Sequence, residues 1–364
     1  MIRIDEIYNN IFLQKLQELP YHQMHWFDPF GSVKYSDLMS APARPARERA
    51  VRYLFWDQEP LHKNLIDDAL TQFCSDFAND QCHIVTSERN SETVNYVERT
   101  YGMKSHYYFF HGWAALDWFR GYDCSFLMPA PEQRKITTTF ISPNRIIGGE
   151  RFHRFLMFYH MCKNNLLFNH VSFPDSCPAE KTHVENLIQT ASAIYPDIYE
   201  VFYDKNGVLK MSLPMTFAGE DHIPMDSYRL SLFEPASESL LYLVSETVAR
   251  GRKLHLTEKT FKPICLRMPF VIVGTCGSLR YLRSYGFRTF GDLWDESYDD
   301  EPNDIVRLER ITDLLKQLDQ LTVDQKQDLF DRAREIVEHN YQHFYGGAFK
   351  DILWQELNNM VHAF

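Results

Sequence analysis

The sequence predicts an α/β protein of two lobes, each a parallel sheet covered by helices. Short apolar runs alternate with amphipathic helical stretches along most of the chain, which is the pattern of parallel strands joined by helices. The chain has 364 residues, whereas a single hydrophobic core stops growing at roughly 250–300 residues. A Pro-Ala-Pro break at 129–131 interrupts the alternation and marks the expected linker between the lobes.

The first lobe is expected over residues 1–132. Two helices are predicted between its strands, at 61–77 and 91–101, and Ser91 is the expected N-cap of the second. The strands themselves are short apolar or β-branched runs, predicted at 53–56, 82–86 and 106–110.

The second lobe is expected over residues 133–345, and a final helix at 349–362, within the segment 346–364, is expected to pack back on the first lobe. Thr322 and Gln325 form a capping-box pattern. The segment 174–226 has mixed patterning and predicts no clear element. Strands are predicted at 135–142, 166–173, 240–245 and 269–273. Helices are predicted at 150–164, 258–266, 278–285, 304–321 and 322–339.

Composition excludes several classes of protein. Lys plus Arg is 38 and Asp plus Glu is 49, so the net charge of −11 argues against a basic coat for nucleic acid. No apolar run is long enough to span a membrane, and the N-terminal stretch lacks the apolar core of a signal peptide. The seven cysteines form no C-x-x-C pair, which indicates reduced thiols. A cytoplasmic location is therefore expected, in the host cytoplasm if the protein is viral.

The strongest local signal is Thr257-Glu258-Lys259, which opens a predicted helix directly after a loop. A helix start presents unpaired N–H groups and the positive end of the helix dipole. Together with the lysine it suits a phosphate, and the glutamate can accept hydrogen bonds from ribose hydroxyls. An N-cap by Thr257, with Glu258 complementing the dipole, would explain the same residues without a ligand.

Two further segments follow predicted strands. Glu246 comes at the end of strand 240–245, and the turn from Gly274 through Gly277 to Ser278 follows strand 269–273. In open α/β sheets, ligands bind beyond the carboxyl ends of strands. The turn also offers N–H groups for a phosphate before the next helix, although a simple tight turn explains it equally well.

Residues 135–300 resemble the donor-binding half of glycosyltransferases with the two-lobed GT-B fold, above all the α-1,3-fucosyltransferase-like group with its phage and marine-microbe relatives. The order strand, Ser-Glu-Thr, loop, Thr-Glu-Lys, helix, strand, Gly carries the resemblance, together with the stretches 277–287 and 294–299. Thr247 departs from the pattern, because asparagine follows the glutamate in that group. The resemblance implies two Rossmann-like lobes with a central cleft and a C-terminal helix that returns to the first lobe.

The resemblance also implies residue roles. Glu258 and Lys259 would hold the ribose and phosphate of the nucleotide, and an early arginine of the donor lobe would contact the diphosphate. Arg145 follows the first strand of that lobe, with Arg154 nearby. The residues expected to bind a nucleotide-diphosphate sugar are Arg145, Arg154, Glu246, Thr257, Glu258, Lys259, Gly274, Gly277 and Ser278.

An inverting sugar transfer needs a base that removes the proton of the acceptor hydroxyl. Asp57 and Glu59 follow strand 53–56 and are the leading candidates, and His111 is a weaker one. Capping of the next helix by the carboxylates, and core packing of the histidine, are the alternative explanations.

The acceptor is expected on an aromatic stretch near the N-terminus. His22, His25 and Trp26 lie there, and aromatic rings stack on sugar faces or bases. We expect no metal or cofactor, because the chain has no Asp-x-Asp pair and the two histidines lack a third ligand. The acid-rich stretch 295–300 is expected to be a solvated loop.

Three functional hypotheses follow. The first is a metal-independent, inverting glycosyltransferase that transfers a sugar from a nucleotide-diphosphate sugar to an acceptor such as a glycan. The second has a modified DNA base as acceptor, supported by a basic patch of Arg44, Arg47, Arg49 and Arg52, which a solvated face explains slightly better. The third is a nucleotide-sugar-binding protein without catalytic activity.

Overall fold

The structure, a computed structural model, describes residues 4–12, 22–27, 35–40, 51–74, 81–121, 127–177, 182–217 and 229–363. The chain divides into two compact units. Unit 1 comprises Met1–Arg120, Lys253–His255 and Gly347–Phe364, and unit 2 comprises Gly121–Arg252 and Leu256–Gly346. The units therefore divide at 120 and 346, against the predicted 132 and 345, and three residues of a late loop belong to unit 1.

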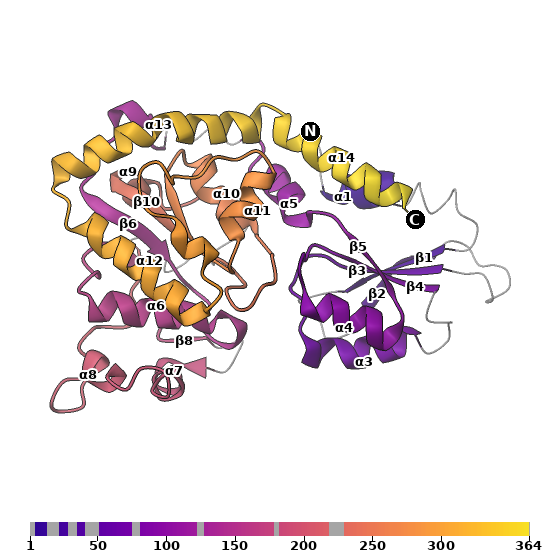
Figure 1. The fold of residues 1–364 in the computed structure, drawn as a ribbon, viewed down its shortest axis with the longest axis horizontal. Coiled ribbons are helices and arrows are strands. Elements are labelled where there is room, and N and C mark those ends of the chain that lie inside the picture. The colour runs from indigo at the N-terminus through magenta and orange to yellow at the C-terminus, as the bar shows by residue number, and fades with distance from the viewer. Residues whose placement is uncertain are drawn as a thin grey trace. The chain divides into compact units, whose positions relative to one another are not determined.

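Unit 1 is built on a five-stranded sheet with the order β2-β1-β3-β4-β5 (Figure 1). Four of its strands run parallel, and β2 pairs antiparallel with β1 at one edge. The described side chains of β3 and β4 are almost all buried, which is typical of strands with helices on both faces. The strands are β1 (His22–Phe27), β2 (Tyr35–Ser40), β3 (Val51–Trp56), β4 (Cys82–Thr86) and β5 (Lys104–Tyr107).

Helices cover this sheet, with α3 and α4 on one side and α14 on the other (Figure 1). On the first side, Leu54 and Ile84 of the strands pack with Ile66, Phe73 and Val97 of the helices in one hydrophobic cluster. Each such side chain stabilises the fold by about 1.5–3 kcal/mol. The helices are α1 (Ile4–Glu6), η1 (Ile7–Phe12), α3 (Lys63–Cys74), α4 (Glu92–Tyr101), α5 (Phe110–Trp118) and α14 (Ala348–His362).

Unit 2 contains a four-stranded parallel sheet with the order β11-β10-β6-β7. The chain first adds β7 on one side of β6 and later returns to add β10 and β11 on the other side. The order of strands therefore reverses between β6 and β10, and ligands of open α/β sheets bind at the carboxyl ends beside such a point. The strands are β6 (Thr138–Pro143), β7 (His170–Ser172), β10 (Ser239–Ser245) and β11 (Phe270–Val273), and β8 (Ser176–Cys177) pairs with β9 (Thr182–His183).

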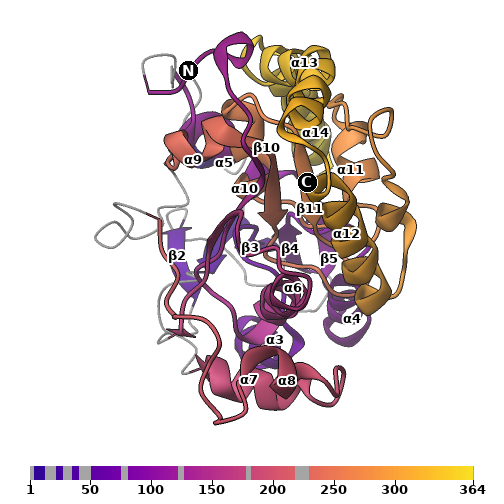
Figure 2. The same cartoon turned by 90° about the vertical axis from the view of Figure 1, so that its left-hand side faces the viewer.

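Helices α6, α7 and α8 of unit 2 pack on one another (Figure 2). Stacked rings fill the space beside α6: Phe158 lies on Phe173 at 3.8 Å, and Phe155 lies on Phe202 at 5.6 Å. The high aromatic content of the chain is thus used in the core. The helices of unit 2 are η4 (Pro131–Gln133), η5 (Gly149–Arg151), α6 (Phe152–Lys163), α7 (Val184–Ala191), α8 (Ile198–Phe202), α9 (Phe233–Glu238), α10 (Glu258–Cys265), α11 (Ser278–Ser284), η7 (Ser297–Asp300), α12 (Asp304–Asp319) and α13 (Val323–Tyr345).

The predicted helix caps are confirmed. The Ser91 hydroxyl accepts a hydrogen bond from the amide of Val94 at 3.2 Å, at the start of α4. Thr322 and Gln325 form the reciprocal capping box that begins α13. That helix runs to Tyr345 rather than ending at 339.

Two predicted strands are wrong in part. The strand predicted at 106–110 ends at Tyr107, and α5 begins at Phe110. Every residue of its first part, Phe110–Ala115, is buried, so the helix shows no amphipathic period that would identify it. The strand predicted at 166–173 is restricted to β7, because a turn occupies the preceding residues, with Asn165 at a positive φ of 57°.

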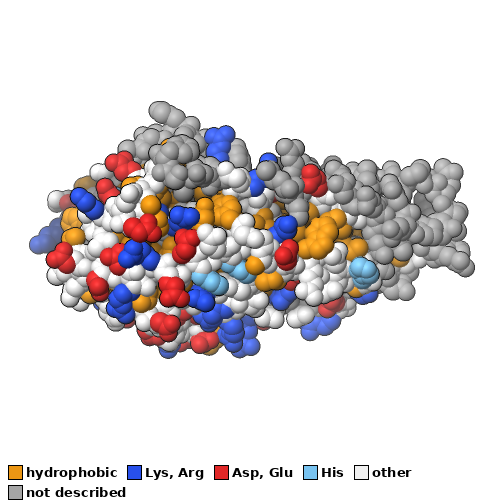
Figure 3. All heavy atoms as spheres, turned by 90° about the horizontal axis from the view of Figure 1, so that it is seen from above, with side chains coloured by type: hydrophobic (Ala, Val, Ile, Leu, Met, Phe, Trp, Pro, Cys, Tyr) orange, Lys and Arg blue, Asp and Glu red, His pale blue; other side chains and the backbone are white. Residues whose placement is uncertain are grey.

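The surface carries mixed charge. On the face drawn in Figure 3, positive and negative side chains are interspersed rather than separated by sign. Among the residues that the structure describes, no helix combines the length and apolar character needed to cross a membrane.

Candidate functional site

Lys259 is held in a defined position in the first turn of α10, in unit 2. Its ammonium group lies 3.3 Å from the hydroxyls of Thr247 and Thr257 and 2.8 Å from the carboxylate of Glu258. The side chain of Lys259 is 26% exposed, so its charge is fixed in place and still reachable. A fixed, accessible cation at a helix start suits an anionic ligand.

Glu246 connects the end of β10 to this helix start. Its side chain is 0% exposed, and its carboxylate accepts hydrogen bonds from the amide and hydroxyl of Thr257 at 3.1 and 2.7 Å. The hydroxyl of Thr260, at 2.6 Å, and the amide of Thr247, at 3.2 Å, complete the set. The prediction that Glu246 contacts the donor is therefore corrected: the residue is buried and positions the two threonines beside Lys259.

Glu246→Gln is expected to destabilise the protein by about 3 kcal/mol. Each carboxylate oxygen accepts a hydrogen bond from one backbone amide, of Thr257 or Thr247, so the NH2 group of glutamine must face an N–H in either orientation. Urea unfolding measures the change, with Glu335→Gln as the control at a side chain that is 88% exposed. Equal stability of the two variants would contradict the assigned role.

Arg154 is also a positioning residue, which corrects its predicted contact with the diphosphate. The side chain is buried, and its guanidinium donates to the carbonyl oxygens of Ile146, Ser245 and Glu246 at 2.9 to 3.1 Å. These bonds tie the loop after β6 to the end of β10. Arg145, in the same loop, is exposed and forms no ion pair with any described residue, so its charge remains available to a ligand.

The turn after β11 is not the anion site that the sequence suggests. Asp299 occupies the start of α11: its carboxylate accepts from the amides of Leu279 and Arg280 at 2.9 and 3.1 Å, and its carbonyl accepts from Gly277 at 2.7 Å. Burial raises the pKa of the Asp299 carboxyl. The acid-rich stretch is thus not wholly solvated. Its buried aspartate occupies the free amides at the start of α11, and of the predicted residues it binds the amide of Gly277.

Gly274 and Ser278 have a packing role in this turn. A Cβ at Gly274 would lie 2.6 Å from the Ser278 hydroxyl, which donates to the carbonyl of Thr275 at 2.7 Å. Gly277 precedes α11 with a φ of 84°, in the left-handed region that favours glycine. These three residues therefore have packing and backbone roles in place of the predicted contacts with the donor.

Two buried polar atoms at the strand ends lack a hydrogen-bond partner among the described residues: Oδ1 of Asn144 and Oγ of Ser245. Asn144 directly follows β6 and Ser245 ends β10, and these two strands pair in parallel. An unsatisfied buried polar group costs about 1–3 kcal/mol. Such costs are typical of functional sites, and here they occur where the strand order reverses.

A second polar cluster lies at the carboxyl ends of β3, β4 and β5, in unit 1. Asp57 is 1% exposed, its carboxylate accepts a hydrogen bond from the Tyr108 hydroxyl, and its carbonyl accepts from the Ser87 hydroxyl at 2.7 Å. The buried ring of His111 meets that of His255 edge to face at 4.9 Å.

Glu59 differs from these candidates in being half-buried. It follows β3 by three positions, in the loop that also carries the buried Asp57. Of the three predicted bases, Glu59 is therefore the one with the most accessible side chain. Tyr108 was not predicted, because the sequence placed it inside a strand at 106–110, and only the structure ends β5 at Tyr107.

Residues 253–255 are bound by hydrogen bonds and an ion pair to the polar cluster at the carboxyl ends of β3, β4 and β5. Leu254 exchanges backbone hydrogen bonds with Arg89 at 2.8 and 3.0 Å, and Lys253 lies 2.8 Å from the carboxylate of Glu88, which is fully buried. These bonds bring His255 to 3.5 Å from the Ser87 hydroxyl. The sequence offered no signal for this, because the contacts join segments more than 150 residues apart.

The predicted acceptor residues are only partly placed. His22, His25 and Trp26 lie on β1, and their side chains are outside the described residues. Of the predicted basic patch, Arg44, Arg47 and Arg49 are also outside the described residues. Arg52 is buried, donates to the carbonyl of Phe73 at 2.7 Å and lies over its ring at 4.5 Å, so it is not part of a solvated face.

Two histidines of α6 predict a loss of stability in acid. Burial, followed by the charge of Arg154, lowers the pKa of His153 to about 3. Burial, followed by the charge of Lys163, lowers the pKa of His160 to about 4, and its Nε2 lies 2.8 Å from the hydroxyl of Tyr195. The unfolded chain takes up these protons below about pH 6.5 and the native state does not, so stability is present above that pH and is lost as pH falls toward 4.

Each of these histidines is expected to lower the free energy of unfolding by about 2 kcal/mol between pH 6.5 and pH 5. Urea unfolding at pH 6.5 and at pH 5 measures how much the free energy of unfolding falls with pH. The His160→Asn variant is expected to show a smaller fall. An unchanged slope in the variant would show that His160 titrates normally.

Comparisons with protein-family models, curated proteins and solved structures found no match for this chain. Within the described part of the chain, no group of three or more His, Cys, Asp or Glu side chains is arranged to hold a metal ion.

Proposed function

We propose that the protein is a glycosyltransferase that moves a sugar from a nucleotide-sugar donor to a hydroxyl acceptor. The observation that carries the proposal is the fixed, partly exposed ammonium of Lys259, held by the hydroxyls of Thr247 and Thr257 and by the carboxylate of Glu258, at the start of α10. The neighbouring loop adds the exposed guanidinium of Arg145. Sugar transfer releases a phosphorylated leaving group, and fixed cations stabilise the charge that develops on it.

The proposal assigns the donor to unit 2 and the acceptor to unit 1, as the two lobes of a GT-B-like fold. Both units present polar residues where their parallel strands end, which is where such sheets bind ligands. In unit 2, Glu246 and Arg154 hold the donor-binding loops in place. Metal-independent, inverting transfer is part of the proposal, with the cations of the chain neutralising the leaving group.

Glu59 is the proposed base that accepts the proton of the acceptor hydroxyl. It combines a carboxylate with the accessibility that Asp57 and His111 lack. Asp57 would then position the loop, through its bonds to Tyr108 and Ser87. A carboxylate within hydrogen-bond reach of the attacking hydroxyl typically contributes about 10²–10⁴-fold to the rate.

A thermal-shift screen against UDP, GDP, CMP and dTDP tests the proposal, because a ligand that binds the folded state alone raises the melting temperature. Stabilisation by at least one nucleotide is expected, followed by release of that nucleotide from its sugar conjugate. Binding without turnover on any acceptor would favour an inactive binding protein, and transfer to a hydroxylated DNA base would identify the acceptor class. No stabilisation by any of the four would overturn the proposal.

A further inference from the structure

A pocket of about 550 Å³ lies against the consecutive helices α12 and α13 of unit 2 (Figure 1). The loop before η7, with Trp294, supplies a further part of its wall. Pockets that bind small organic ligands have volumes of about 300–1,000 Å³. The residues that line this pocket are distinct from those around Lys259, so it is a separate place on the molecule.

The floor of the pocket is apolar. Leu314 and Leu318 line it from one face of α12, since residues four positions apart lie one helical turn from each other. Leu293 and Leu321 are only half-buried, so apolar surface remains in contact with water here. An apolar ligand body would cover that surface. The apolar lining residues are Leu293, Trp294, Leu314, Leu318, Leu321 and Leu329.

The rim of the pocket carries more negative than positive charge. Its charged lining residues are Asp295, Asp324, Asp328 and Arg332, so their formal sum is 1 − 3 = −2. Asp324 and Asp328 lie one turn apart on α13, where like charges repel. Neither carboxylate forms a hydrogen bond or ion pair with a described residue. A pair between Arg332 and Asp328 would still leave two carboxylates.

Asp295 is held in place at the rim. Its carboxylate accepts hydrogen bonds from the amide and the hydroxyl of Ser297, both at 2.8 Å. These bonds lower the pKa of Asp295, so its carboxylate is ionised at neutral pH. Arg310 acts on Asp295 from outside the pocket and is itself paired with Glu301 at 2.8 Å. The rim therefore suits a cation.

Trp294 independently indicates a ligand in this pocket. The residue lines the pocket, is only 7% exposed, and stacks on the ring of Phe290 with the centroids 5.1 Å apart. Its Nε1 is buried and has no hydrogen-bond partner among the described residues. Buried N–H groups of native proteins nearly always have an acceptor. A ligand that brings an acceptor into the pocket would supply the missing partner.

We infer that this pocket binds a small organic amine, a molecule with an ammonium head, an apolar body and a hydrogen-bond acceptor on that body. The carboxylates of Asp324 and Asp328 bind the ammonium, the leucines cover the body, and the indole of Trp294 donates to the acceptor. A bare metal ion would leave the apolar floor uncovered, and the rim would repel an anion. The inference does not rest on the proposed function.

Calorimetry on the full chain with three related probes tests the inference. The probe para-methoxyphenethylamine has all three expected features, para-methoxyphenylpropanoate replaces the ammonium by a carboxylate, and phenethylamine lacks the ether oxygen. The wild-type protein is expected to bind the methoxy amine about tenfold more tightly than the acid, because the rim is negative. It is expected to bind the methoxy amine about fivefold more tightly than phenethylamine, because one hydrogen bond is lost.

Two variants and a control locate the binding. The double variant Asp324→Asn with Asp328→Asn is expected to weaken binding of the methoxy amine about tenfold. Gln317→Trp fills the pocket from α12 and is expected to abolish binding of both amines. Asp313→Asn removes an α12 carboxylate outside the pocket, at a side chain that is 66% exposed, and is expected to bind as the wild type does. All four substituted residues are exposed, so the melting temperatures are expected to match the wild-type value.

Each outcome supports or overturns a stated part of the inference. Failure of the wild-type protein to bind the methoxy amine would overturn the site and would leave the proposed function at Lys259 untouched. Equal affinity for the amine and the acid would overturn the role of the rim charges. Equal affinity for the two amines would overturn the role of Trp294. Wild-type affinity in Gln317→Trp would show that the probe binds elsewhere and would overturn the pocket as its site.

Discussion

Lys259→Ala is expected to weaken binding of the stabilising nucleotide by about 10- to 100-fold. The substitution removes the fixed cation at the start of α10, which is the group best placed to contact a phosphate. Isothermal calorimetry measures the dissociation constant of the nucleotide. Raising the salt concentration should weaken nucleotide binding by the wild-type protein more than binding by the variant.

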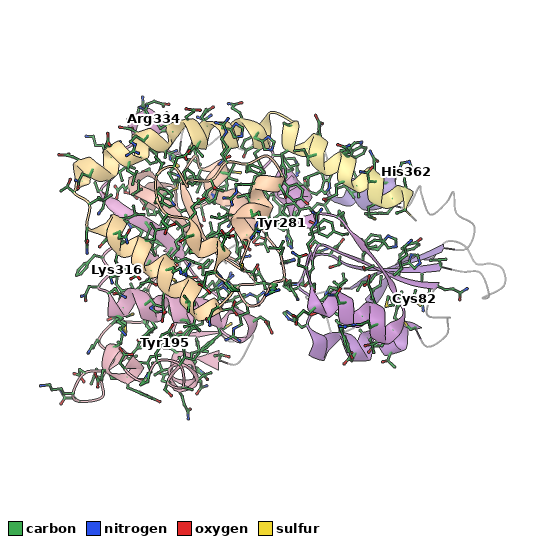
Figure 4. All side chains as sticks on the ribbon, in the orientation of Figure 1. Cys82, Tyr195, Tyr281, Lys316, Arg334 and His362 are labelled. Atoms are coloured by element: carbon green, nitrogen blue, oxygen red, sulfur yellow. The ribbon has the colours of Figure 1, made fainter. Side chains whose placement is uncertain are left out.

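Two control variants make this result specific. Lys316→Ala removes a lysine of unit 2 that is 41% exposed on α12 (Figure 4), and it is expected to bind nucleotide as the wild type does. Lys259→Arg keeps the charge and is expected to retain part of the affinity. Wild-type affinity in Lys259→Ala would remove the observation on which the proposed function depends.

Glu59→Gln is expected to lower the turnover number by about 10²–10⁴-fold while nucleotide affinity remains unchanged. Glutamine keeps the size of the side chain and cannot accept the proton of the acceptor hydroxyl. The half-buried position of Glu59 makes a large loss of stability unexpected. Steady-state kinetics with saturating donor, together with calorimetry on the same variant, separates catalysis from binding.

Asp57→Asn is the informative comparison. Asp57 is buried and bonded to Tyr108, so its variant is expected to lose stability as well as activity. If Glu59→Gln turns over at the wild-type rate, the base lies elsewhere in unit 1. A turnover loss confined to Asp57→Asn, with the fold intact, would move the role to that residue.

Much of the fold could be predicted from local patterns. The strand at 82–86 and the caps at Ser91 and Thr322 coincide with the structure, because each depends on residues only a few positions apart. α5 escaped prediction, since burial on every side removed its amphipathic period. The strands β1 and β2 escaped because an aromatic, polar stretch carries no alternation that identifies a strand.

The candidate site was predictable as a region but not as a set of contacts. The Thr-Glu-Lys motif correctly marked a helix start with a lysine beside threonine hydroxyls. The same logic wrongly assigned ligands to the start of α11, because Asp299 lies 20 positions away from its amide partner at Leu279. A motif shows which backbone N–H groups a helix start offers. It cannot show that an acceptor from another part of the chain already binds them.

By itself, the sequence determined the alternation of strands and helices, the caps and the segment that carries Lys259, since these follow from spacing and side-chain chemistry along the chain. Only the tertiary structure decided which charged groups are already bonded within the protein and which remain accessible to a ligand. The guanidinium of Arg154 donates to the carbonyl of Glu246, 92 positions away, whereas the guanidinium of Arg250 lies over the ring of Phe152. The physical reason is that a buried polar group needs hydrogen-bond partners, and the fold supplies these partners from segments that are distant in the sequence.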